Sequence, residues 1–118
     1  MNPSDLSGKY VYLAGPYKNG VQGENARRSV IIADRLMGDG ILVFNPLLSH
    51  WHAKYSGRQG EWWYAYDLKW LERCEYLIYL PGPSKGVELE IRHAVTMGIP
   101  VYEIGEILPD WEGILEGK

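Results

Sequence analysis

The stretch YLIYLPGPSKGVELE, residues 76–90, decides the fold that we expect for this chain. It opens with an apolar run at 76–80, which is typical of a strand buried on both faces of a parallel sheet. It then turns through a Pro- and Gly-rich loop at 81–86 and continues into an amphipathic segment at 87–97. A strand that leads directly into a helix is the unit from which α/β folds are built.

The rest of the chain repeats this unit. Further strands are predicted at residues 10–14, 41–44 and 101–104, and further helices at 25–37, 61–74 and around 108–115. We therefore expect an α/β fold, namely a flavodoxin-like (Rossmann-like) parallel sheet of four to five strands flanked by helices. Residues 45–60 are expected to form a long loop, and connections of that length often carry function.

Apolar spacing also predicts which side of each helix is buried. In 87–97 the predicted buried face is Val87, Ile91, Ala94 and Val95, with Glu88 and Glu90 at its opposite edges. In 61–74 the recurring aromatic residues are Trp62, Tyr66 and Trp70, with Trp63 and Leu71 beside them. In 25–37 the apolar stripe is Ala26, Val30, Ala33, Leu36 and Met37.

Length and composition exclude several classes of protein. The chain has 118 residues, a formal net charge of −3 and a single cysteine, Cys74. One domain over residues 1–118 is expected, and a disulfide framework or a Cys-based zinc site is excluded. No run of Lys or Arg favours polymeric nucleic acid, and no apolar stretch approaches the roughly 18 residues of a membrane span. Because no signal peptide is recognisable, a cytoplasmic protein is expected.

Two similar loops follow the first and third predicted strands. AGPYKNG at 14–20 and PGPSKG at 81–86 each contain Gly-Pro, then Lys, then Gly. In a flavodoxin-like sheet these two strand ends border the ligand crevice. Backbone N–H groups, a helix N-terminus and lysine charge suit a phosphate group. Gly and Pro also explain the turns without any ligand, so both interpretations remain open.

Three titratable residues could share one site. Glu90 has no Lys or Arg three or four positions later, whereas Glu88 can pair with Arg92, although the helix dipole alone also explains an early acid. Asp67 borders an apolar helix face, or is a solvated or Lys-paired acid. Tyr12 lies inside a strand, where a buried hydroxyl needs a partner such as a carboxylate on a neighbouring helix.

Other candidate groups favour no metal or thiol chemistry. His50 and His52 form a His-Trp-His pair without a third ligand at a suitable spacing, so we expect no metal and interpret them as surface or substrate contacts. Cys74 is expected to be buried and inert. Two carboxylates without a metal suit glycosidic bond cleavage, in which one attacks the anomeric carbon and the other manages the leaving-group proton.

Four motifs, taken in order, resemble the nucleoside 2-deoxyribosyltransferase superfamily, which includes the 2'-deoxynucleoside 5'-phosphate N-hydrolases. They are VYLAGPY at 11–17, FNP at 44–46, YDL at 66–68 and SKGVELE at 84–90, the last followed by Ala94. The resemblance covers nearly the whole chain. It implies a flavodoxin-like fold, assembly as a homodimer or higher homo-oligomer, and no cofactor.

The resemblance also implies roles for individual residues. Glu90 matches the nucleophile that attacks C1', Asp67 the acid that assists the departing base, and Tyr12 the residue that orients the nucleophile. The substrate and phosphate site is expected to comprise Gly15, Pro16, Tyr17, Lys18, Asn45, His50, Ser84 and Gly86. The nucleoside transferases usually carry an Asp at the position of Ser84, where it holds the sugar hydroxyl. Because an Asp would repel a phosphate, a serine at this position favours a 5'-monophosphate.

Two positions extend or depart from the family pattern. The family hydrolases commonly have a small residue where this chain has Glu88. Leu89 lies opposite the predicted core face of its helix and marks a candidate subunit interface. The family often completes its site with a residue from the neighbouring subunit, and we assign none here.

We therefore expect an N-glycosidase that cleaves or transfers the base of a (deoxy)nucleoside 5'-monophosphate. The alternative is a non-catalytic nucleotide-binding or sensing module on the same fold. A response regulator is disfavoured because no predicted strand ends in a phospho-acceptor Asp, and FMN binding has no support beyond the general fold.

Aromatic composition adds one hypothesis. The chain has five Trp and nine Tyr but one Phe, and four of the Trp lie between Trp51 and Trp70. Some of these rings, with Tyr17 and Trp63 as candidates, are expected to stack on a base or to shield a carboxylate from water.

Overall fold

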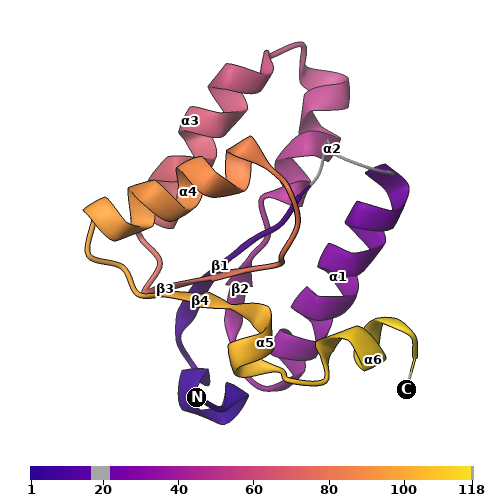
Figure 1. The fold of residues 1–118 in the computed structure, drawn as a ribbon. Coiled ribbons are helices and arrows are strands. Elements are labelled where there is room, and N and C mark those ends of the chain that lie inside the picture. Colours follow the sequence, from indigo (N-terminus) through magenta and orange to yellow (C-terminus); the bar gives the residue numbers. More distant parts are fainter. Residues whose placement is uncertain (17–21, 118) are drawn as a thin grey trace.

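The computed structural model describes residues 1–16 and 22–117, and its strands form a parallel sheet (Figure 1). Within these residues the sheet has four strands in the order β2-β1-β3-β4. The strands are β1 (Tyr10–Ala14), β2 (Leu42–Phe44), β3 (Tyr76–Tyr79) and β4 (Val101–Glu103). The predicted flavodoxin-like α/β fold is confirmed, and each strand boundary lies within one residue of its predicted position.

Helices connect and flank these strands. They are η1 (Pro3–Leu6), α1 (Gln22–Gly38), α2 (Leu47–Ser56), α3 (Gly60–Leu71), α4 (Lys85–Thr96), α5 (Ile104–Ile107) and α6 (Trp111–Leu115). The helix predicted around 108–115 corresponds to α6, which begins at Trp111, and the short helix α5 before it was not predicted. Pro109 separates them, since a proline disfavours helical backbone at the residue before it.

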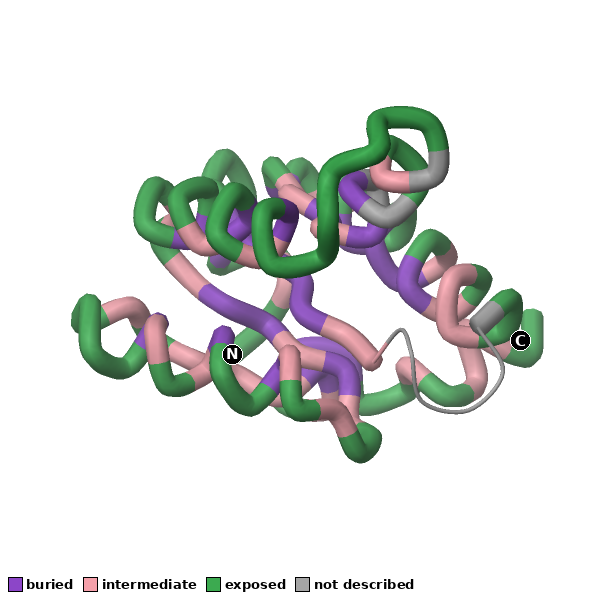
Figure 2. The backbone as a smooth tube through the Cα atoms, turned by 90° about the horizontal axis from the view of Figure 1, so that it is seen from above, coloured by how far each residue is buried: buried purple, intermediate pink, exposed green. Residues whose placement is uncertain are grey.

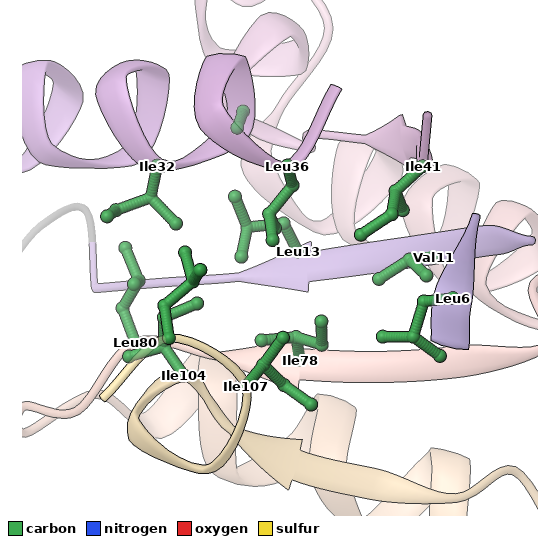
Figure 3. Packing of buried hydrophobic residues seen from close by; sticks show 12 residues of the cluster. Leu6, Val11, Leu13, Ile32, Leu36, Ile41, Ile78, Leu80, Ile104 and Ile107 are labelled. Carbon is green, nitrogen blue, oxygen red and sulfur yellow. The ribbon is translucent and has the colours of Figure 1, made fainter. Parts of the chain in front are cut away.

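The two faces of the sheet bury different sets of side chains, because successive strand residues point to opposite sides. Val11 and Leu13 pack with residues of α1 and α5 in a purely apolar cluster (Figure 3). Tyr12 and Ala14 pack on the other side with residues of α3 and α4. Both sets are fully buried, so β1 forms the centre of the molecule.

Residues 45–60 do not form the long loop that we expected, because α2 lies within them. The side chain of Asn45 accepts a hydrogen bond from the Leu47 N–H at 3.0 Å and so starts the first turn. Gly57 ends the helix with a left-handed φ of 73°, which glycine adopts at little cost. The polar and aromatic sequence between these residues obscured the helical period.

The predicted buried faces of the helices are shifted in the structure. On α4 the buried residues are Val87, Glu90 and Ala94, while Val95 is exposed. On α3 the buried residues are Trp63, Asp67 and Leu71, while Trp62, Tyr66 and Trp70 are exposed. On α1 the buried apolar residues are Ile32, Ala33 and Leu36, while Val30 and Met37 are exposed. Figure 2 shows this division, with buried segments on the strands and exposed residues on the outer turns.

Candidate active site

The loops after β1 and β3 lie against each other, as their neighbouring strands require. A Cβ on Gly15 would meet Leu80 Cδ1 at 3.2 Å, and one on Gly82 would meet Pro16 Cγ at 2.9 Å. Gly82 also has a φ of 140°, which other residues rarely adopt. The glycines therefore allow close packing at the point where the strand order reverses, the usual position of a ligand in such sheets.

A cavity of about 560 Å³ opens at this point. Seven of the predicted site residues line it: Gly15, Pro16, Asn45, Asp67, Ser84, Gly86 and Glu90. The predictions for Tyr17 and Lys18 fall outside the described residues, and so does the side chain of His50, whose backbone belongs to α2.

Glu90 and Tyr12 form the innermost contact of the site. Glu90 is 8% exposed, and its Oε2 accepts a hydrogen bond from the hydroxyl of the fully buried Tyr12. Burial raises the pKa of Glu90 to about 7, opposed by the Tyr12 hydrogen bond and assisted by the charge of Asp67. Burial and Glu90 both raise the pKa of Tyr12 far above its usual value, so its hydroxyl remains a donor.

Asp67 is the second buried carboxyl group, and it comes from the neighbouring helix α3. It is 7% exposed, and its Oδ1 accepts a hydrogen bond of 2.6 Å from the hydroxyl of Ser49 on α2. Burial raises the pKa of Asp67 to about 6, and the Ser49 hydrogen bond opposes this rise. Two carboxyl groups that influence each other thus line one cavity, each with a hydroxyl donor bound to one oxygen.

The N-terminus of α4 forms another part of the cavity wall. Ser84 caps this 12-residue helix by accepting a hydrogen bond from the Val87 N–H at 3.2 Å, which leaves its own O–H to donate. Lys85 and Gly86 also line the cavity, and their N–H groups have no intrahelical acceptor because they lie in the first turn. Backbone donors, a hydroxyl and a lysine therefore converge where an anion could bind.

Asn45 is held in a fixed orientation at the end of β2. Its Oδ1 accepts hydrogen bonds from Ser29 Oγ at 3.2 Å and from the Leu47 N–H at 3.0 Å. Both bonds use the amide oxygen, so the orientation of the side chain is fixed. Asn45 also lines the cavity, so its side chain can contact a bound molecule.

Two aromatic residues of α3 complete the wall beside Asp67. Trp63 is 9% exposed, and its indole N–H has no acceptor among the described residues. Tyr64 is half-buried, and burial together with nearby Glu90 raises the pKa of its hydroxyl. They precede Asp67 by four and three residues, so all three lie on one side of the helix.

Several lining residues were not predicted from the sequence: Ser29, Ser49 and Tyr64. Tyr64 lies one turn before Asp67, so helical spacing could have identified it. Lys85 belongs to the loop at 81–86 that was predicted to suit a phosphate, and it lines the cavity. Ser49 could not be identified, because it lies in the segment interpreted as a loop.

The remaining candidates lie away from this chemistry. Glu88 is exposed, and its expected ion pair with Arg92 is not among those formed by the described residues. Leu89 is 46% exposed, and His52 is also exposed. Cys74 is half-buried, and burial raises the pKa of its thiol to about 11. Among the side chains that the structure describes, which do not include that of His50, no group of three or more His, Cys, Asp or Glu could hold a metal ion.

Comparison with protein families and with curated proteins identified no relative of this chain: no family model matches it, and no curated protein matches it. Within the described ranges, none of the helices combines the length and apolar character that a membrane crossing requires.

Proposed function

We propose that this protein is an N-glycosidase or glycosyl transferase of the nucleoside 2-deoxyribosyltransferase type, acting on a (deoxy)nucleoside 5'-monophosphate. One observation carries the proposal: two buried carboxyl groups, Glu90 and Asp67, line one cavity, and a buried tyrosine hydroxyl is bound to the first. Glycosidic cleavage with retention uses such a pair.

In the proposed first step, the free oxygen of Glu90 attacks C1' of the sugar. The C1'–N bond breaks, its electron pair passes to the base, and Asp67 donates a proton to that base. The Tyr12 hydrogen bond supports the assignment of Glu90 as nucleophile, because it favours the ionised carboxylate.

In the second step, water attacks C1' and the ester bond to Glu90 breaks. Asp67, now ionised, accepts a proton from that water, and (deoxy)ribose 5-phosphate is released. An acceptor base in place of water would complete a transfer instead. No metal or redox group is needed for the electrons and protons to balance.

The anion-binding features at α4 support a phosphorylated substrate. Ser84, Lys85 and Gly86 line the cavity that also contains Glu90, one to two turns along the same helix. A phosphate bound at the helix N-terminus would gain from backbone N–H donors, the helix dipole and the lysine charge.

A panel of ribo- and deoxynucleosides and their 5'-monophosphates tests the proposal, with chromatographic detection of free base. We expect base release from at least one monophosphate, and the Glu90→Ala variant should lose at least about 1,000-fold of that rate. Glu88→Ala, two residues away on the exposed side of α4, is the matched control and should retain it.

Two results would contradict this proposal in different ways. Undiminished turnover by Glu90→Ala would refute the nucleophile assignment. Tight nucleotide binding without release from any substrate would indicate the alternative, a non-catalytic binding or sensing module.

The proposal extends to a cytoplasmic homodimer or higher homo-oligomer. Exposed apolar side chains on α3 and α4 support assembly, among them Trp62, Trp70, Leu89 and Val95. Light scattering coupled to size exclusion would test it, and a mass of one chain at micromolar concentration would refute it.

A further inference from the structure

Ser49 makes the hydrogen bond that defines how Asp67 is presented to the cavity. Its hydroxyl donates to Oδ1 at 2.6 Å, and Ser49 and Asp67 are 6% and 7% exposed. Among the described residues, no other donor reaches this carboxyl group. Both residues are buried, and this hydroxyl is the described donor that determines the hydrogen bonding of Asp67.

The direction of this bond has a chemical consequence. A protonated carboxyl group has one carbonyl oxygen, which accepts, and one hydroxyl oxygen, which donates. When Ser49 donates to Oδ1, that oxygen takes the carbonyl role and the proton resides on Oδ2. We propose that Ser49 is a positioning residue that directs the transferable proton of Asp67 to Oδ2, the oxygen left for the departing base.

This inference rests on the proposed function, because that function makes Asp67 the acid. It also explains what α2 contributes to the site. The Ser49 N–H donates to the Pro46 carbonyl at 2.9 Å, and the side chain of Asn45 holds the Leu47 N–H. The first turn of α2 is thereby fixed at two points, and Ser49 is presented to α3 from a rigid support.

Several titratable groups surround this pair and belong in any test of its pH dependence. Glu90 and Lys85 face the cavity from α4, Tyr64 from α3 itself, and Tyr12 lies beneath Glu90 on β1. From α2, the described ring of His52 lies 5.7 Å from that of Trp63, toward the exposed surface. Ser49 is the described residue that hydrogen-bonds to Asp67, so its removal is the direct perturbation.

The first measurement is independent of catalysis. In the Ser49→Ala variant, Asp67 loses a donor to its ionised form while it remains buried, so its pKa should rise above about 6. Carboxyl NMR titration of wild type and variant measures this shift. Ser49→Thr, which keeps the hydroxyl, should leave the pKa close to the wild-type value, and Ser56→Ala, at the exposed end of α2, is the matched control.

The second measurement uses turnover. Ser49→Ala should lower kcat about 10-fold with KM within twofold, and the pH optimum should move upward with the pKa of Asp67. A nitrophenyl glycoside of the same sugar phosphate releases its leaving group without a proton. With that substrate Ser49→Ala should approach the wild-type rate.

The outcomes separate this inference from the proposed function. If wild type releases no base from any substrate, the proposed function fails, and Ser49 has no proton to direct, even if the NMR shift is seen. If wild type is active but Ser49→Ala leaves the pKa of Asp67 unchanged, the positioning role is refuted while the function stands. The same conclusion follows if Ser49→Ala lowers the rate with the nitrophenyl substrate as much as the rate with the nucleotide.

Discussion

The two faces of the sheet differ in the side chains that they bury. One face is apolar, and the other carries the ionisable groups of the candidate site. The cluster shared with α1 and α5 contains only Leu, Ile, Val and Ala among its buried residues. The opposite face, under α3 and α4, buries Tyr12 and adjoins two buried carboxyl groups. One face supplies stability through apolar burial, while the other holds groups whose ionised forms are costly to bury.

The largest effect on stability is expected from damage to the apolar face. Leu13→Ala removes a fully buried side chain and should lower the free energy of unfolding by about 3 kcal/mol. Chemical denaturation measures this loss, and turnover per folded molecule should not change. A loss below about 1 kcal/mol would mean that the apolar face is not the main source of stability.

On the face that carries the site, removal of a buried charge is expected to raise the free energy of unfolding instead of lowering it. The pKa of Glu90 is about 7 in the folded protein and near 4.5 for the free side chain, so stability falls as the pH rises between these values. Glu90→Gln removes this penalty and should raise the free energy of unfolding at pH 8 by about 2 to 3 kcal/mol. At pH 4 the gain should vanish, and an equal gain at both pH values would exclude ionisation as its cause.

A smaller effect is expected at the contact that links the site to the sheet. Tyr12→Phe removes the donor to Glu90, so the pKa of that carboxyl should rise further above its usual value. We expect turnover to fall about 10-fold at pH 7 and the acidic limb of its pH profile to move upward. A limb that stays in place would show that Tyr12 only packs against Glu90.

The smallest effect is expected at the rim of the cavity. Lys85→Ala should raise KM for a 5'-monophosphate about fivefold without changing kcat, because an exposed lysine contributes modestly to phosphate binding. The corresponding nucleoside, which has no phosphate, should show no change. Equal effects on both substrates would place the phosphate elsewhere.

The sequence predicted the strands closely because their apolar runs are continuous and end at Gly and Pro. The helix faces were harder, and α4 shows why. Its apolar pattern predicts Val95 inside and Glu90 at an edge, whereas the structure buries Glu90 and exposes Val95. An ionisable residue in the centre of a buried face contradicts the usual distribution of Glu, so hydropathy alone assigns the wrong side.

The same shift occurs on α3, where Asp67 lies on the buried face between Trp63 and Leu71. The helices α3 and α4, which supply the candidate carboxyl groups, both have shifted faces, and so does α1, which supplies none. Local rules often fail where function requires an exception, but the shift on α1 shows that a shifted face alone does not indicate a site. The contact of Ser49 with Asp67 lay beyond reach, because it joins two helices of which one was not predicted.

The aromatic wall has a practical consequence. Trp63 is buried in the cavity wall, whereas Trp51, Trp62 and Trp70 are each more than 40% exposed. Indole emission shifts to shorter wavelength in apolar surroundings, so the blue edge of the spectrum should originate from Trp63 and, to a smaller extent, from Trp111, which is half-buried against the apolar cluster away from the cavity. The protein thus contains its own optical reporter, and quenching at that edge would follow ligand binding without any label.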